Sequence, residues 1–431
     1  MTKNLTLKTL ALSLSMMLLA PFANVSYAAE ASTGPEIVSK AAIVMDYETG
    51  EIIYEKNAND QMFLASTTKL MTALLFAENK TKTDKITYTA TALAQPPYTV
   101  NSDQMLPYGK SMKVGDTLDG DTVMKELLLF SGNDMAYMIA DSLGGDSTKF
   151  AAMMNAKAKE LGLNNTHFET PNGLPINNID VNYSTAYELG ILAKTAYEND
   201  WIRETIQLSE ADVVLPGDTR IKITNRNTEL NKNGNIGGKT GITDQAGTCF
   251  AGVYEINGRK LIGVVLKSDL YDNNKRFEDL SLMMNYSEAL ERETFKAANE
   301  EVESTELEYK LFKFFGPVKK ITVPVVLAED AKLYNNAINN EEGTIALSNT
   351  TTDAWKAASD NNVTLTLSVK DFKTDVKGTV NITTSQIMQE NAGIYIAVVA
   401  AIIIVLILLM FIVKLLGSLS RGSKSNKRRK Y

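Results

Sequence analysis

The spacing of hydrophobic and polar residues predicts strands and helices in turn over the first 290 residues. Apolar or alternating runs predict strands at residues 41–46, 51–54, 237–243, 247–254 and 260–266. The first two flank a Tyr-Glu-Thr-Gly turn and the last two an Asn-Gly turn, so each pair predicts an antiparallel hairpin. Apolar residues at helical spacing predict helices at residues 66–75, 123–129, 135–143, 150–161, 184–189 and 277–289.

The pattern changes towards the C-terminus. Short apolar runs, several with a period of two, are separated by loops rich in Asn, Asp and Thr; they lie at residues 321–326, 344–347, 363–369 and 378–382. This pattern predicts a small all-β domain over residues 305–388, after a first domain over residues 35–295. The second domain contains no cluster of candidate catalytic residues. We interpret it as a spacer between the first domain and a membrane.

Both ends of the chain carry apolar segments of a different kind. Two lysines, an apolar run from Leu10 to Ala20 and a Ser-Tyr-Ala site predict a secretory signal peptide at residues 1–28. Residues 393–413 carry no charge and, at about 1.5 Å per residue, can cross a bilayer core of about 30 Å. The basic tail at residues 414–431 is expected to stay cytoplasmic. The sequence therefore predicts a single-pass membrane protein whose body is exported.

Composition narrows the possible functions. The formal net charge is −7, and the predicted signal peptide and tail contain no acidic residue, so the exported part is more acidic still. An acidic body argues against nucleic acid as a partner. The single cysteine, Cys249, has no partner for a disulfide. The single histidine, His167, is interpreted as a packing or hydrogen-bonding residue, and one Cys with one His cannot build a zinc site.

The candidate chemistry centres on Ser66, which begins an apolar helix three residues before Lys69. At positions i and i+3 the two side chains share one helical face, so the lysine amine can contact the serine hydroxyl. A nucleophilic serine needs an adjacent base. Lys69 is placed to be that base, and the N-terminal end of the helix offers unpaired N–H groups where an oxyanion would form.

Two later tripeptides supply partners for this pair. Ser131 and Asn133 belong to a Ser-Gly-Asn tripeptide between two predicted helices, where side chains can face a cleft. Lys239, Thr240 and Gly241 form a Lys-Thr-Gly tripeptide on a predicted strand. The glycine lets a peptide substrate approach the strand backbone. The ordered set SxxK, SxN and KTG is typical of penicillin-binding proteins and class A β-lactamases.

With these motifs in place, residues 36–290 resemble the D-alanyl-D-alanine carboxypeptidases, which are low-molecular-mass penicillin-binding proteins and serine DD-peptidases. The segments Asn-Thr-His-Phe at 165–168 and Pro-Asn-Gly-Leu at 171–174 also carry the resemblance. It implies an α/β (α+β) catalytic domain of the DD-peptidase/β-lactamase-like kind, with an antiparallel sheet flanked by helices, a β-rich domain and a membrane anchor. The family often has a histidine where this chain has Asn182. Many members anchor by an amphipathic helix instead of a full span.

The resemblance implies a substrate and three catalytic roles. The substrate would be a peptidoglycan stem peptide ending in D-Ala-D-Ala, and Ser66 would attack the carbonyl between the two D-alanines. Lys69, its charge disfavoured by burial near Lys239, would take the proton. Ser131 would relay the proton to the leaving amine. Water would then hydrolyse the acyl-enzyme, and β-lactam antibiotics would acylate the same serine as inhibitors.

The resemblance also implies how the substrate is held. Asn133 would hold the substrate amide, and the N–H groups of Ile242 and of the nucleophile would form the oxyanion hole. Lys239 and Thr240, with Gly241 beside them, would attract the free carboxylate. By the pattern of the family, Arg276 would supply another cation for this carboxylate. No metal or organic cofactor is required by this chemistry.

Other functions fit the same residues. The site could belong to a transpeptidase, an endopeptidase or a β-lactamase, because the three tripeptides do not encode which acceptor reaches the serine. A fast β-lactamase needs a base for deacylation, and the helical spacing of Phe150, Met154 and Leu161 places the candidate Glu160 on an outer face. A non-enzymatic penicillin sensor or wall-binding scaffold is a further alternative, which the short basic tail disfavours.

Overall fold

The computed structural model describes residues 34–96, 112–348 and 353–425, with side chains as far as Ser418. The predicted signal peptide and the last residues of the basic tail lie outside this range.

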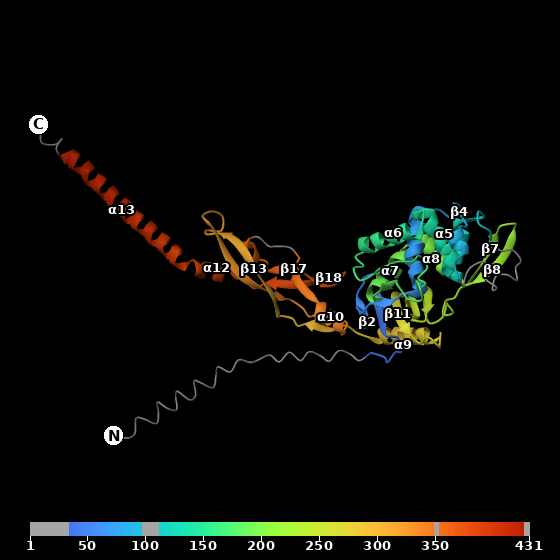
Figure 1. The fold of residues 1–431 in the computed structure, drawn as a ribbon. Coiled ribbons are helices and arrows are strands. Elements are labelled where there is room, and N and C mark those ends of the chain that lie inside the picture. Colours follow the sequence, from blue (N-terminus) through green and yellow to red (C-terminus); the bar gives the residue numbers. More distant parts are fainter. Residues whose placement is uncertain (1–33, 97–111, 349–352, 426–431) are drawn as a thin grey trace, which may run out of the picture. The chain divides into compact units, whose positions relative to one another are not determined.

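A five-stranded antiparallel sheet lies at the centre of the first 290 residues (Figure 1). Its strand order is β2-β1-β11-β10-β9. The strands are β1 (Ala41–Asp46), β2 (Ile52–Lys56), β9 (Asn235–Thr243), β10 (Gly247–Ile256) and β11 (Arg259–Ser268). Both predicted hairpins are confirmed, and β9, which carries the Lys-Thr-Gly tripeptide, is an edge strand.

Helices cover both faces of this sheet. Every residue of β1 is buried. Ala41 and Ile43 pack in the hydrophobic cluster that contains α7, whereas Ala42 and Val44 pack in a second cluster with α9. Side chains alternate between the faces of a strand, so a strand covered on both sides must be apolar throughout. This explains why residues 41–45 form one continuous apolar run instead of an alternating pattern.

The remaining elements of this region are helices and short strand pairs. The helices are α2 (Lys69–Asn79), α3 (Ala90–Leu93), α4 (Gly120–Lys125), α5 (Asn133–Gly144), α6 (Ser147–Glu160), α7 (Ala186–Glu198), α8 (Asp200–Ile206) and α9 (Lys275–Ala289), with a 3-10 turn η1 (Ala65–Thr68) and a π-helical segment η3 (Glu126–Phe130). The short strands are β3 (Met62–Phe63) with β6 (Tyr183–Ser184), β4 (Lys85–Thr87) with β5 (Thr117–Asp119), and β7 (Glu210–Leu215) with β8 (Thr219–Thr224).

A second five-stranded antiparallel sheet, in the order β13-β14-β18-β17-β16, dominates the segment after α9. Its strands are β13 (Glu301–Lys310), β14 (Val318–Leu327), β16 (Thr344–Leu347), β17 (Asn362–Val369) and β18 (Phe372–Val380). A small pair, β12 (Glu293–Lys296) with β15 (Ala331–Leu333), and the helices α10 (Ala337–Glu342), α11 (Ala354–Ala357) and α12 (Thr384–Glu390) complete it. The sequence patterns predicted four of the sheet strands but not β13, whose exposed positions are mostly glutamates.

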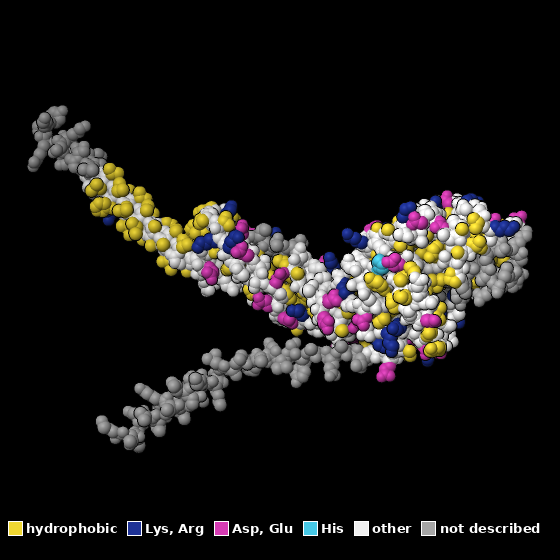
Figure 2. Space-filling view, in the orientation of Figure 1, with side chains coloured by type: hydrophobic (Ala, Val, Ile, Leu, Met, Phe, Trp, Pro, Cys, Tyr) yellow, Lys and Arg dark blue, Asp and Glu magenta, His cyan; other side chains and the backbone are white. Residues whose placement is uncertain are grey.

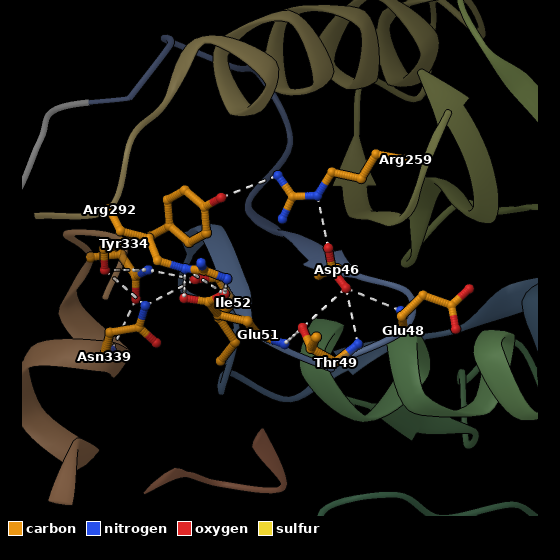
Figure 3. Close-up of polar contacts among 10 residues, drawn as sticks. Asp46, Glu48, Thr49, Glu51, Ile52, Arg259, Arg292, Tyr334 and Asn339 are labelled. Carbon is orange, nitrogen blue, oxygen red and sulfur yellow. Dashed lines mark hydrogen bonds and ion pairs between the residues drawn. The ribbon is translucent and has the colours of Figure 1, made fainter. Parts of the chain in front are cut away.

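An ion pair between a buried carboxylate and an exposed guanidinium holds the start of this second segment against the β1–β2 hairpin (Figure 3). The carboxylate of Glu51, fully buried, accepts hydrogen bonds from the Arg292 guanidinium at 2.9 and 3.0 Å. Nearby, the Asn339 amide donates to the carbonyl oxygen of Ile52 at 2.9 Å. A carboxylate buried without a partner is costly, so Arg292 fixes where the chain leaves the first sheet.

A second ion pair lies beside the first (Figure 3). Arg259, at the start of β11, donates to the Asp46 carboxylate at 2.7 Å and to the Tyr334 hydroxyl at 3.1 Å. Asp46 also accepts from the backbone of Thr49 at 2.9 Å, which closes the β1–β2 turn. The same turn therefore contacts both the first sheet and the segment that follows it.

The described chain ends in the long helix α13 (Ala392–Ser425). Its residues Ala392–Ser418 are long and apolar enough to cross a membrane, and none of the apolar stretch is buried inside the protein. A helix that is apolar on all sides and leaves this apolar stretch exposed is typical of a membrane span.

Candidate active site

The Lys69 amine is the point at which three distant segments meet. Its Nζ atom lies 2.8 Å from Ser66 Oγ, 2.8 Å from Asn133 Oδ1 and 3.0 Å from the carbonyl oxygen of Asn172. The Lys69 side chain is 0% exposed. Burial, and after it the positive charge of Arg226, lowers the pKa of this amine to about 7.

These contacts orient the amine once it is neutral. The oxygens of Asn133 and Asn172 can only accept hydrogen bonds, so they engage the two N–H groups of a neutral amine. The remaining lone pair then faces the third neighbour, the hydroxyl of Ser66. The geometry can therefore remove a proton from Ser66, and the predicted contact between the two side chains is present.

Ser66 lies on the 3-10 turn η1, and the α-helix α2 begins only at Lys69. The difference from the predicted helix start has a local cause, because Ala65 has a left-handed φ of 47°. That conformation is unfavourable for a residue with a Cβ atom. Gly173 packs closely against this turn: a Cβ atom on it would lie 1.8 Å from the Ala65 carbonyl oxygen. The loop that supplies Asn172 thus supports the nucleophile turn directly.

Ser131 lies on the connection between η3 and α5, as predicted, whereas α5 begins at Asn133, earlier than the predicted helix at residues 135–143. Ser131 has a left-handed φ of 70°, and its hydroxyl accepts a hydrogen bond from Lys239 Nζ at 2.9 Å. Asn133 is the first residue of α5. Two left-handed residues with a Cβ atom, Ala65 and Ser131, therefore adjoin or belong to the proposed machinery, and such strain is typical of functional sites.

Lys239 is 1% exposed and lies behind the pocket. Burial and the positive charges of Lys69, Arg226 and Arg276 hold the pKa of its amine well below the usual range. On the same strand, a Cβ atom on Gly241 would lie 2.8 Å from the Leu64 carbonyl oxygen and 3.1 Å from the Ser66 nitrogen. The absence of a side chain at Gly241 is thus required for close packing against the turn that carries Ser66. The sequence analysis explained this glycine only by the approach of a substrate.

One pocket is lined by seven of the nine predicted site residues. The other two, Lys69 and Lys239, form hydrogen bonds with lining serines. The pocket lining consists of Ser66, Ser131, Asn133, Leu174, Arg226, Thr228, Thr240, Gly241, Ile242, Asn273, Asn274, Arg276 and Phe277. The lining contains no Asp or Glu among the described residues. Arg276 is buried and donates to the Gly241 carbonyl at 3.3 Å. A pocket lined by two arginines and by no carboxylate among the described residues suits an anionic ligand.

Sequence reasoning did not assign a role to Arg226 or to Asn172, two residues that support this site. Arg226 donates from Nε to the carbonyl of Phe130 at 2.6 Å, which supports the Ser-Gly-Asn connection, but no motif marks it. Asn172 was quoted only as part of a resembling segment, although its carbonyl is a Lys69 acceptor. Asn182, where the family often has a histidine, donates to Thr68 Oγ1 at 3.1 Å and to the Thr170 carbonyl at 2.8 Å. Asn182 thereby holds the turn η1 through Thr68.

The residues that the sequence analysis did not assign to the site also lie outside the pocket lining. His167 packs its ring on Tyr183 and contacts Glu169 at 2.8 Å. Glu160 is exposed and pairs with Lys157. Cys249 is buried, and burial raises the pKa of its thiol to about 11. In the described part of the chain no group of three or more His, Cys, Asp or Glu residues could hold a metal ion.

A buried acid lies on η3, the π-helical segment that precedes Ser131. Neither carboxylate oxygen of Glu126 has a hydrogen-bond partner among the described residues. Burial, and then the negative charge of Asp134, raises the pKa of Glu126 well above its usual range. The folded state therefore holds a proton that the unfolded state releases above a pKa of about 4.3. Stability must fall as pH rises from this value.

We expect the substitution Glu126→Gln to remove this loss of stability at higher pH. The melting temperature of the variant should rise relative to wild type between pH 5 and pH 8, by roughly 2–4 °C for each kcal/mol regained. Thermal unfolding followed by circular dichroism measures the difference. Glu291→Gln, at an exposed position, is the control and should show no such trend. A variant whose difference from wild type stays constant with pH would contradict the assignment.

Comparison with known proteins gives one consistent result. A family profile described as D-alanyl-D-alanine carboxypeptidase matches residues 28–269. The chain is 29% identical over 265 residues to D-alanyl-D-alanine carboxypeptidase DacF of Bacillus subtilis, covering 60% of this chain and 65% of that protein. It is 33% identical over 256 residues to DacC of Escherichia coli, covering 57% and 60%. The chain thus spans less than two thirds of the length of these relatives.

Comparison with solved structures shows that the fold is also similar to that of a DD-peptidase. The crystal structure of the Streptomyces K15 DD-transpeptidase aligns with a TM-score of 0.52 at 30% identity. The alignment covers 60% of this chain and all of the Streptomyces protein.

Proposed function

The chain belongs to the D-alanyl-D-alanine carboxypeptidase family, since the family profile matches more than half of its residues, and on this premise we propose that it removes the terminal D-alanine from peptidoglycan stem peptides. One observation carries the proposal above the others. The buried amine of Lys69 contacts the hydroxyl of Ser66 while its two other neighbours can only accept hydrogen bonds. This arrangement supplies a serine with a base, which nucleophilic catalysis requires.

Acylation begins when Ser66 Oγ attacks the carbonyl carbon between the two terminal D-alanines. Its proton passes to the neutral amine of Lys69, whose pKa of about 7 suits a base that works near neutral pH. The leaving D-alanine needs a proton on its nitrogen. The hydroxyl of Ser131, bonded to Lys239, is the group proposed to relay it. Water then cleaves the ester on Ser66 and completes hydrolysis.

The free carboxylate of the substrate explains why the enzyme would act at a C-terminus. Arg276 stays cationic at neutral pH, and Thr240 offers a hydroxyl in the same pocket. An arriving carboxylate also favours the protonated form of Lys239. β-Lactams, which carry an equivalent carboxylate and a strained amide, are proposed to acylate Ser66 and to remain attached.

We also propose that the protein acts from the outer face of a membrane. The helix Ala392–Ser418 is long enough to span a bilayer, and the predicted signal peptide and basic tail support this direction. The segment from β12 to α12 would then stand between the active site and the lipid.

A direct test follows release of D-alanine from a pentapeptide stem ending in D-Ala-D-Ala by the full chain in detergent. The matched control is the same peptide with an amidated C-terminus, which should react far more slowly because its carboxylate is missing. Absence of D-alanine release together with penicillin labelling would favour a penicillin sensor. Rapid turnover of penicillin would favour a β-lactamase.

Transfer in place of hydrolysis is a second candidate, because the Streptomyces K15 structure to which this fold is similar is named a DD-transpeptidase. Adding an amine acceptor to the same assay separates the two. Transfer yields free D-alanine and a tetrapeptide joined to the acceptor amine, whereas a strict carboxypeptidase yields only free D-alanine and the unmodified tetrapeptide.

Substitution of Gly241 by alanine is expected to lower kcat/KM for D-alanine release by roughly 100-fold, because displacing reacting groups by about 1 Å has such an effect. The new Cβ atom would press on the Leu64 carbonyl and on the backbone nitrogens of Ser66 and Thr67. Activity and thermal stability should be measured on the same preparation. Near-normal turnover would show that the nucleophile turn tolerates the displacement.

A further inference from the structure

We propose that the tip of the β13–β14 hairpin, residues 311–318, inserts into the headgroup layer of an anionic bilayer beside α13. This inference rests on the proposed membrane anchoring and adds a second contact with the lipid. It concerns the β-rich segment, for which no catalytic role is proposed.

The hairpin tip exposes large apolar side chains. Phe314 is 79% exposed, Phe315 66% and Val318 58%. The tip is well ordered by its own contacts: Phe312 and Phe315 stack with ring centroids 5.1 Å apart, and the Phe312 N–H donates to the Phe315 carbonyl at 3.0 Å. Two neighbouring phenylalanines held outward on a rigid turn form an apolar patch that water does not favour.

The tip is fixed to the first turn of the helix proposed to span the membrane. The hydroxyl of Tyr395 donates to the Leu311 carbonyl at 2.6 Å, and its ring lies 5.7 Å from that of Phe312. Asn391, just before α13, donates to the Tyr309 hydroxyl at 2.7 Å and accepts from Lys319 at 2.8 Å. The hairpin and the start of the helix therefore form one bonded unit.

The position of Tyr395 sets the depth of the tip. About 20 residues span the hydrocarbon core, and the apolar stretch Ala392–Ser418 has 27. Its first few residues are thus expected in the interface, where tyrosine side chains are enriched. Because Phe312 contacts Tyr395, the exposed phenylalanines next to it lie at the level of the lipid headgroups.

The charge of the hairpin selects the lipid. Residues 310–320 include four lysines and no acidic residue, although the chain as a whole has a net charge of −7. Lys320 pairs with Glu306, which leaves Lys310, Lys313 and Lys319 around the aromatic tip. In Figure 2, hydrophobic side chains cover α13 and gather with Lys and Arg side chains on the adjoining end of the β13–β14 pair. Cations flanking exposed aromatics are typical of a segment that binds anionic lipid.

The test places a nitroxide label at Val318→Cys in the full chain, reconstituted in nanodiscs that contain anionic lipid. The native Cys249 is buried and should not react with the label. The same label at Lys373→Cys, on the far side of the β14–β18 pairing from the tip, is the control. Collisions with dissolved oxygen, which enters the acyl region, are compared with collisions with a water-soluble nickel complex.

We expect the ratio of oxygen to nickel collisions to be severalfold higher at position 318 than at position 373. Phe314→Ser combined with Phe315→Ser should lower this ratio at position 318, and so should nanodiscs made of zwitterionic lipid at physiological salt. Equal ratios at the two positions would overturn the insertion. Exclusion of both reagents at position 318 would overturn it in favour of a second protein copy on the patch. Failure of the full chain to enter nanodiscs would overturn the anchoring as well, while D-alanine release by the same preparation in detergent would leave the proposed activity unaffected.

Discussion

Replacement of Ser66 by alanine is expected to abolish both D-alanine release and covalent penicillin labelling. No acyl-enzyme can form without Oγ, and loss of the nucleophile in a serine peptidase lowers kcat by roughly a million-fold. D-alanine release at high enzyme concentration and gel detection of a fluorescent penicillin measure the two effects. The fold should survive, because the amine of Lys69 keeps its contacts with Asn133 and Asn172.

The matched control for this experiment is Ser359→Ala. Ser359 begins the second Ser-x-Asn tripeptide of the chain, but it lies in the turn after α11 and its hydroxyl donates to the Trp355 carbonyl at 2.9 Å, away from the pocket lining. It should behave as wild type. Labelling that persists in Ser66→Ala and disappears in Ser359→Ala would contradict the assignment of the nucleophile.

Replacement of Lys69 by methionine has the second largest expected effect. Methionine fills the buried site with an unbranched apolar chain but accepts no proton, so the rate of acylation by penicillin should fall by roughly 10²- to 10⁴-fold, the usual contribution of a general base. Lys69→Arg is the paired variant. It keeps a positive charge, yet it cannot act as a base because a guanidinium stays protonated. Stopped-flow or quenched labelling gives both rates.

The pH dependence of wild type supplies an independent check on Lys69. The amine is a base only when unprotonated, so the acylation rate should rise with pH through about 7 and then level off. Both Lys69 variants should lack this rising limb. A methionine variant that retains the limb would assign the titration to another group, such as the neighbouring Lys239.

Local patterns accounted for the framework of this fold. The continuous apolar run at β1, the Asn-Gly turn between β10 and β11 and the helical spacing before Ser131 each depend on residues close in sequence, so hydrophobic periodicity and turn chemistry predicted them. The contact of Lys69 with Ser66 is also local, because the two residues lie three apart on one helical turn.

Features that depend on packing between distant segments were not predictable in this way. Arg226 affects the site through space from a loop without a motif, and the turn at Ala65, where φ is left-handed, packs against Gly173, which lies far away in the sequence. The strand β13 was missed since its alternation places glutamates outward and its inward positions are few. The assignments of individual site residues to substrate contacts stay predictions until a ligand is bound.

The contacts of the Lys69 amine determine when the active site forms during maturation of the protein. This amine joins positions 64 and 103 residues farther along the polypeptide, so a serine activated by this amine exists only after the whole domain has assembled. Under the proposed export and the proposed acylation by β-lactams, a precursor that is still unfolded during export would not be acylated. Covalent labelling of living cells by a β-lactam would accordingly detect only the molecules whose domain has folded. The time course of labelling could report how quickly these molecules mature after secretion.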